Sequence, residues 1–175
     1  LYLVGMLVLL RILKVDPWLS VVGAIAFAFS SYFFVILPAG HTSKANAIGY
    51  MPMVLGGLYL LYRGRMMLGA ALLGLFLGLQ IMQNHLQVTY YLAILLLLFV
   101  LAELVRALRE KTIADFFMRS GLGAVAATLA VLCNIGVLWS TVEYGKYSTR
   151  GKSELTILPD GSSAEGIRTE GLDRD

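Results

Sequence analysis

The sequence predicts an all-α fold, a polytopic bundle of transmembrane helices. Of the 175 residues, 58% are hydrophobic and only 14% are charged. So few charges cannot solvate the surface of a soluble domain of this size. The apolar residues also come in long blocks that short polar stretches separate, which is typical of a multi-pass membrane protein.

Six apolar blocks follow one another along the chain, and we expect each to form one membrane helix. A helix needs about 20 residues to cross the hydrocarbon core, so the first block is expected to be a truncated span. Because the chain begins at Leu1 without a methionine, we interpret it as an internal fragment. We expect a transmembrane region over residues 1–141 and an extracytoplasmic loop over 142–175. The blocks have the approximate bounds 1–13, 18–37, 47–62, 66–82, 88–105 and 120–139.

Two local signals bear on where these helices begin. Asp16-Pro17-Trp18 predicts a helix start, with Asp16 as N-cap, Pro17 in the first turn and Trp18 at the membrane interface. Pro52 lies inside the third block, and a proline costs little only in the first turn. We therefore expect the third helix to begin near residues 48–50.

The distribution of Lys and Arg predicts which turns face the cytoplasm. Positive charge is retained on the cytoplasmic side. Eight basic residues lie in the first, third and fifth turns between the blocks, whereas the second and fourth turns carry only Lys44. The second and fourth turns, which contain His41 and His85, are therefore expected to face outward, together with the tail. The tail adds five basic residues, but long segments are translocated largely regardless of charge. Since the basic residues occupy short turns, we expect no nucleic-acid partner. The basic residues of the first, third and fifth turns are Arg11, Lys14, Arg63, Arg65, Arg106, Arg109, Lys111 and Arg119.

A polar stretch follows the fourth block and contains one of the chain's two histidines. His85 is expected at the N-terminus of the fifth helix, where free N–H groups favour an anion. Gln87, Tyr90 and Tyr91 then share one helical face, and Asn84 precedes them. These side chains could bind phosphate or a sugar. The alternative is an ordinary helix turn with tyrosines at the interface.

Another polar stretch, residues 39–46, precedes the third block and contains His41 and Lys44. Lys44 is the natural partner for a phosphate, although a solvated loop with one lysine is the alternative. Two histidines without nearby Cys, Asp or Glu do not make a metal site. We therefore expect no metal site and no cofactor, with a divalent ion left open.

Three further polar residues have structural interpretations. Glu103 and Arg106 are spaced i, i+3 and predict a surface pair at the cytoplasmic end of the fifth helix. Cys133 and Asn134, near the outer end of the sixth helix, are expected to contact neighbouring helices.

Several segments of the chain together resemble one family of bacterial membrane proteins. They are Gly40-His41-Thr42 with Lys44, Tyr50-Met51-Pro52, residues 83–91, and the tail segments 143–156 and 171–175. These segments resemble the YfhO family, in its Bacteroidetes-type form. That family is similar to the GT-C class of glycosyltransferases. The resemblance implies a GT-C-like bundle in the bacterial cytoplasmic membrane and a polyprenyl-phosphate sugar as donor.

The function expected from this resemblance is transfer of the sugar to a cell-envelope acceptor on the outer membrane face. His41, Lys44 and His85 would stabilise the leaving phosphate, and Gln87, Tyr90 and Tyr91 would orient the sugar. The catalytic carboxylate of such enzymes would lie upstream of this fragment. The alternatives are a transporter or flippase that recognises the same substrate, and an assembly protein that uses the polar stretches as contacts.

Overall fold

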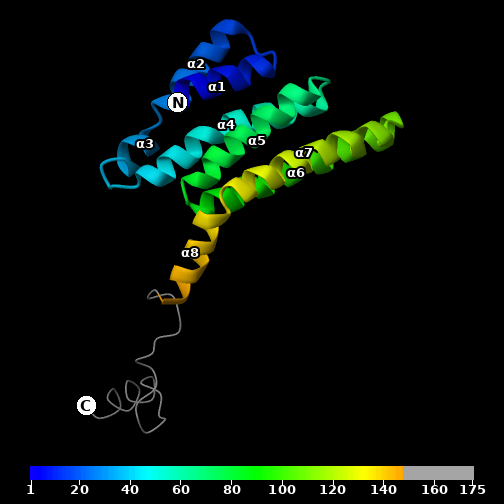
Figure 1. Cartoon of the computed structure of the whole chain (residues 1–175). Coiled ribbons are helices and arrows are strands. Elements are labelled where there is room, and N and C mark those ends of the chain that lie inside the picture. The colour runs from blue at the N-terminus through cyan, green and yellow to red at the C-terminus, as the bar shows by residue number, and fades with distance from the viewer. Residues whose placement is uncertain (148–175) are drawn as a thin grey trace, which may run out of the picture. The chain divides into compact units, whose positions relative to one another are not determined.

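The computed structural model describes residues 1–147, which form eight α-helices and no β-strand (Figure 1). The predicted all-α fold is therefore confirmed. Residues 148–175, with most of the expected extracytoplasmic loop and most of the family-like tail, lie outside the described residues. The helices are α1 (Tyr2–Ile12), α2 (Pro17–Ala28), α3 (Ser31–Ile36), α4 (Thr42–Tyr62), α5 (Met66–Met82), α6 (Leu86–Glu110), α7 (Ile113–Cys133) and α8 (Ile135–Tyr147).

The chain divides into two compact units, Leu1–Ile135 and Gly136–Asp175. The expected boundary between residues 141 and 142 falls inside the second unit and stays a prediction. All of α1 to α7 belongs to the first unit, and α8 belongs almost entirely to the second. Every polar residue proposed for a site lies in the first unit.

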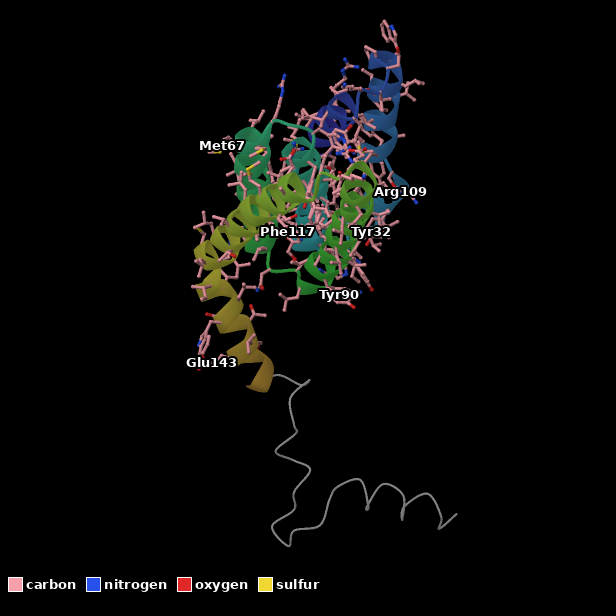
Figure 2. All side chains as sticks on the ribbon, turned by 90° about the vertical axis from the view of Figure 1, so that its right-hand side faces the viewer. Tyr32, Met67, Tyr90, Arg109, Phe117 and Glu143 are labelled. Atoms are coloured by element: carbon pink, nitrogen blue, oxygen red, sulfur yellow. The ribbon has the colours of Figure 1, made fainter. Side chains whose placement is uncertain are left out.

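Within residues 1–147, three helical segments are long and apolar enough to cross a membrane: Pro17–Ile36, Leu86–Glu110 and Ile113–Cys133. Two further apolar helices, α1 and α5, are shorter. Apolar side chains cover much of the outside of the first unit (Figure 2), and Met67 and Phe117 are both more than half exposed. These features are compatible with a membrane protein, with three candidate spans in place of the six expected.

Three predicted boundaries are wrong. The second block is broken after Ala28, so α2 and α3 are separate helices. The third helix begins at Thr42, because the polar residues of stretch 39–46 form its first turns. Pro52 therefore lies inside α4, where its ring removes a backbone hydrogen bond to residue 48; membrane helices tolerate this where neighbouring helices compensate. The sixth helix begins at Ile113 and ends before Asn134.

The predicted start of the second helix is confirmed. Pro17 is the first residue of α2, and the carboxylate of Asp16 accepts hydrogen bonds from the backbone N–H groups of Trp18 (2.9 Å) and Leu19 (3.3 Å). These bonds satisfy two of the four N–H groups that a helix start leaves free.

Helices α4 and α5 form a hairpin in which the backbones of the two helices are in direct contact. Gly64, with φ of +100°, forms the turn between the two helices. A Cβ added to Gly57 would lie 2.6 Å from the backbone nitrogen of Leu73, and a Cβ on Gly69 would meet the backbone of Leu61. Two glycines thus let the helix backbones touch, as small residues do in membrane helix pairs.

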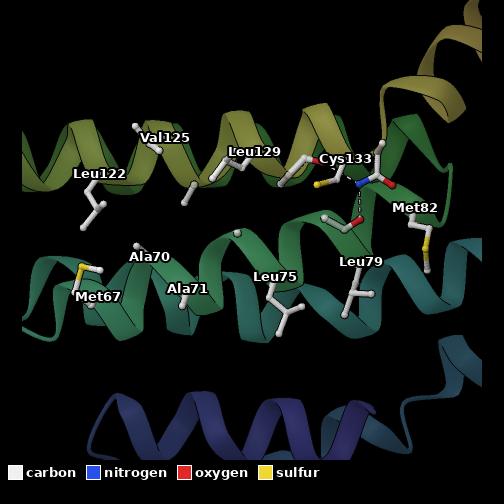
Figure 3. Close-up of a pocket in the computed structure, with 15 residues that line it drawn as sticks. Met67, Ala70, Ala71, Leu75, Leu79, Met82, Leu122, Val125, Leu129 and Cys133 are labelled. Atoms are coloured by element: carbon white, nitrogen blue, oxygen red, sulfur yellow. Dashed lines mark hydrogen bonds between the residues drawn. The ribbon is translucent and has the colours of Figure 1, made fainter.

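Helices α5 and α7 also pack through small residues. Gly74 faces Ala126, Gly78 faces Ala130, and the amide nitrogen of Asn134 donates to the carbonyl of Gly78 at 3.0 Å. This confirms the expected contact of Asn134 with a neighbouring helix. Beside the seam runs an apolar groove of about 620 Å³ (Figure 3). Its lining includes Ala71, Leu75, Met82, Leu122, Leu129 and Cys133.

The helix directions place the polar stretches at one end of the first unit and the basic turns at the other (Figure 1). Helices α4 and α5 run antiparallel (Figure 1), with the Tyr50 and Phe76 ring centroids 6.3 Å apart, so the start of α4 and the end of α5 lie at the same end. At the other end, Arg63 reaches Glu103 of α6. We call the end with residues 41–46 and 80–91 the histidine end, and the end with residues 63–65 and 103–119 the basic end.

Candidate functional site

The histidine end contains a buried hydrogen-bonded pair between α5 and α6. Gln80 is fully buried, and its amide nitrogen donates to the hydroxyl oxygen of Thr89 at 3.1 Å. The Thr89 hydroxyl lies 3.3 Å from both the Gln80 amide oxygen and the His85 carbonyl oxygen, either of which can accept its proton. The pair satisfies polar groups inside an apolar bundle and fixes the turn that carries His85.

His85 is the N-cap residue of α6, as the sequence predicts, but its side chain does not cap the helix. Its Nδ1 atom is buried and has no hydrogen-bond partner among the described residues. Asn84, just before it, has a left-handed backbone with φ of 53°. An imidazole nitrogen without a partner beside the free N–H groups of a helix start is a ready position for an oxygen ligand.

The face of α6 that carries Gln87, Tyr90 and Tyr91 is exposed. Tyr90 and Tyr91 are 63% and 56% exposed, and their ring centroids lie 5.8 Å apart. The amide nitrogen of Gln87, which is also exposed, lies 3.4 Å from the Tyr91 hydroxyl oxygen. These side chains can stack on a flat ligand and hydrogen-bond to it, and they equally suit the interfacial position of aromatic residues.

His41 and Lys44 stand on the first turns of α4, where a loop was expected. His41 is exposed and is the N-cap residue of α4. Lys44 is half-buried, and its ammonium nitrogen lies 5.4 Å from the centre of the Tyr32 ring, a cation–π contact between α3 and α4. The contact orients the lysine without neutralising its charge.

The structure brings the predicted residues together in two groups. Asn84, His85, Gln87, Tyr90 and Tyr91 are consecutive around the start of α6, while His41 and Lys44 sit at the start of α4. Both groups lie at the same end of the first unit. Among residues 1–147, no cluster of three His, Cys, Asp or Glu side chains is suited to a metal ion.

Sequence reasoning missed the partners that fix these residues. Gln80 and Thr89 lie on different helices, and Thr89 was assigned to the polar stretch 83–91 without a partner. Tyr32 was read as part of the second block. The signal that could have found the Gln80–Thr89 pair is that both residues lie about one turn from the connecting loop, where two antiparallel helices are close together.

The predicted i, i+3 ion pair of Glu103 and Arg106 is present, with Arg106 Nε 3.3 Å from a Glu103 carboxylate oxygen, but Glu103 does not lie at the surface. Glu103 is 6% exposed, and its two carboxylate oxygens accept hydrogen bonds from Arg63 at 2.9 and 2.8 Å. Burial lowers the pKa of the Arg63 guanidinium, but the bonds to Glu103 and the nearby Tyr59 raise that pKa above its ordinary value. The turn after α4 is therefore held to α6 by the ion pair between Arg63 and Glu103. Cys133, expected at a helix contact, is instead exposed.

Comparison with known proteins gives no match, whether with protein-family models, with curated proteins or with solved structures. The functional argument therefore depends on the residues of this chain.

Proposed function

We propose that this chain forms the donor-binding part of a GT-C-like membrane glycosyltransferase of the YfhO type. The donor would be a polyprenyl-phosphate sugar, and the acceptor a component of the cell envelope. The observation that carries the proposal is the buried, unpartnered Nδ1 of His85 at the start of a membrane-length helix. In an apolar bundle such a nitrogen is costly unless a ligand or water reaches it.

The roles of the side chains follow from their positions. His85 and the free N–H groups of α6 would hold the phosphate oxygens, and Lys44, at the same end, would add positive charge as the sugar–phosphate bond breaks. His41 would donate a further hydrogen bond from the start of α4. The exposed Tyr90 and Tyr91 would contact the sugar ring, with Gln87 and Asn84 on its hydroxyl groups. A carboxylate outside this chain would act as base toward the acceptor.

Transfer assays on the full-length protein test the proposal. Membrane vesicles would receive a panel of radiolabelled polyprenyl-phosphate hexoses, and label in the acceptor fraction would be measured. We expect His85→Ala and Lys44→Ala to lower the transfer rate by about 10²–10³-fold, the usual loss when one donor to a developing anion is removed. Arg109→Gln is the matched control, because it removes an exposed cation from the basic end.

Two outcomes contradict the proposal. Wild-type transfer rates in both variants would remove the assigned roles. Movement of the labelled lipid across the membrane without any transfer would favour the flippase alternative, in which the same residues recognise the substrate and leave it unchanged.

A further inference from the structure

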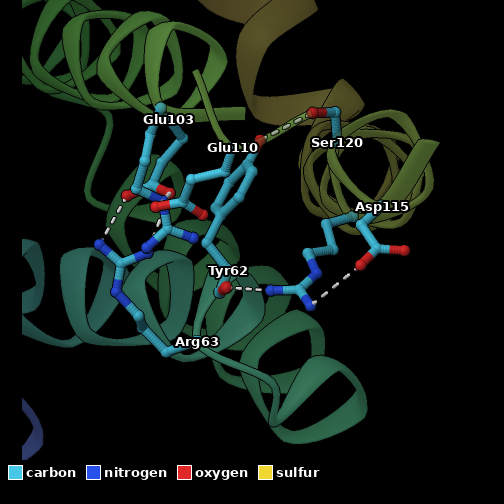
Figure 4. A network of polar contacts seen from close by, with 8 residues as sticks. Tyr62, Arg63, Glu103, Glu110, Asp115 and Ser120 are labelled. Carbon is cyan, nitrogen blue, oxygen red and sulfur yellow. Dashed lines mark hydrogen bonds and ion pairs between the residues drawn. The ribbon is translucent and has the colours of Figure 1, made fainter. Parts of the chain in front are cut away.

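A small polar pocket lies at the basic end, between the end of α4, the end of α6 and the start of α7 (Figure 4). Its volume is about 160 Å³, below the range of about 300–1,000 Å³ of ordinary small-molecule sites. The pocket therefore suits one polar group of a ligand. Its charged lining residues are Glu103, Arg106, Glu110, Asp115 and Arg119.

Two hydrogen-bond donors of this pocket have no acceptor. The Nε atoms of Arg106 and Arg119 are buried and have no hydrogen-bond partner among the described residues. Arg106 Nε lies 3.3 Å from a Glu103 oxygen that already accepts from Arg63, and it is not aligned for a hydrogen bond. Arg119 uses its terminal nitrogens instead, one on the Tyr62 carbonyl. Two guanidinium groups on two helices can therefore donate hydrogen bonds to the oxygens of one phosphate.

The same pocket offers carboxylates that are only loosely engaged. A Glu110 oxygen lies 3.8 Å from Arg106 Nε, the same nitrogen that lies 3.3 Å from Glu103, and an Asp115 oxygen lies 4.0 Å from a terminal nitrogen of Arg119. The side chains of Glu110 and Asp115 are 55% and 59% exposed. These distances are too long for good hydrogen bonds, so both carboxylates can accept from an ammonium group.

The charges of the ion-paired groups at this pocket balance. Three guanidinium groups, from Arg63, Arg106 and Arg119, stand against the three carboxylates of Glu103, Glu110 and Asp115. A neutral pocket gives no net attraction to a simple anion. Separate donors and acceptors within one small pocket instead match a zwitterion that carries a phosphate and an ammonium group.

The position of the pocket along α6 indicates that its ligand is a lipid. Helix α6 has 25 residues, so at about 1.5 Å per residue it is longer than the hydrocarbon core of about 30 Å. The excess length places the residues after Glu103 in the headgroup layer. Phe117 and Met118, which adjoin lining residues Phe116 and Arg119, are exposed apolar side chains that would face the acyl chains of a bilayer.

We propose that this pocket binds the headgroup of phosphatidylethanolamine. The phosphate oxygens accept from the Nε atoms of Arg106 and Arg119, and the primary ammonium donates to Glu110 and Asp115. The site is separate from the histidine end, and it would anchor the junction of α4, α6 and α7 at one leaflet.

Native mass spectrometry of the purified full chain tests this. The chain, in detergent, would receive an equimolar mixture of phosphatidylethanolamine, phosphatidylglycerol and phosphatidylcholine with identical acyl chains. We expect phosphatidylethanolamine to bind best, because phosphatidylglycerol lacks the ammonium group and the ammonium of phosphatidylcholine has no N–H donors. Arg119→Gln should weaken its binding about tenfold, the usual effect of one charge-assisted hydrogen bond.

A second variant keeps the test independent of folding. Asp115→Asn alters an exposed carboxylate, and we expect it to reduce the preference for phosphatidylethanolamine over phosphatidylcholine. Arg109→Gln, an exposed cation on the same helix as Arg106 but outside the pocket lining, should change nothing.

The results that would overturn the proposal are distinct. Equal or better binding of phosphatidylglycerol would mean general attraction of the basic end for anionic lipid. Displacement of the lipid by millimolar phosphoethanolamine or inorganic phosphate would mean a site for soluble ligands. An unaltered lipid preference in Asp115→Asn would remove the ammonium contact.

Discussion

The contact between α4 and α5 predicts a large effect for a single added methyl group, Gly69→Ala. The new Cβ would meet the backbone of Leu61 and lie 2.8 Å from the Gly57 carbonyl oxygen. All of these atoms are backbone, so no side-chain rotation can relieve the overlap and the helices must separate. Overpacking of this kind costs about 1–3 kcal/mol.

The matched control for this substitution is Gly121→Ala in α7. No atom lies within 4 Å of a Cβ added to Gly121. Both substitutions gain the same helix propensity, up to about 1 kcal/mol, so the difference between them isolates the overlap at Gly69.

Thermal unfolding of the purified chain in detergent measures this difference. For a chain of this size, about 1 kcal/mol corresponds to roughly 2–4 °C in Tm. We therefore expect Gly69→Ala to unfold at least about 2 °C below Gly121→Ala. Equal Tm values for the two variants would refute the close approach of the α4 and α5 backbones.

Three further predictions test the framework. Glu103→Ala should lower the free energy of unfolding by about 1–3 kcal/mol, because the Arg63 guanidinium loses its partner. The exposed control Glu110→Ala should change it by less than about 0.5 kcal/mol. Equal losses in the two variants would contradict a structural role for the Arg63–Glu103 pair. Thr89→Val should destabilise the chain more than the double change with Gln80→Leu, since the single change leaves a buried amide unpaired; chemical denaturation of both compares them. In a Cys133→Ser background, cysteines at positions 41 and 85 should react with an impermeant maleimide from the same side of sealed vesicles, and labelling from opposite sides would overturn their shared location.

Much of the framework could be predicted from the sequence because its signals are local. Asp16 and Pro17 define a helix start, and the six apolar blocks correspond in order to the helices of the first unit, except that the second block forms both α2 and α3. The grouping of the polar stretches at one end follows from the number of helices between them. Only the direction of each helix was needed for that prediction.

The partners of the polar side chains could not be predicted, since they depend on packing between distant segments. Glu103 has Arg106 three residues away in sequence, yet its bidentate partner is Arg63, which the α4–α5 turn brings to α6. Likewise, Lys44 meets Tyr32 because α3 turns back over the start of α4. Sequence spacing identifies neighbours along one helix and is silent about neighbours across the bundle.

The two buried polar arrangements of α6 differ in what they leave unpaired. At its start, Gln80 and Thr89 satisfy each other, so the unpartnered Nδ1 of His85 is not required to hold the helices together. At its end, Glu103 is fully used in holding Arg63, so its loss must cost stability. Substitution of His85 should therefore weaken ligand binding with little change in Tm. Substitution of Glu103 should instead lower Tm. This separation follows from which hydrogen bonds are already made, because a nitrogen with no partner makes no stabilising hydrogen bond that its removal could take away.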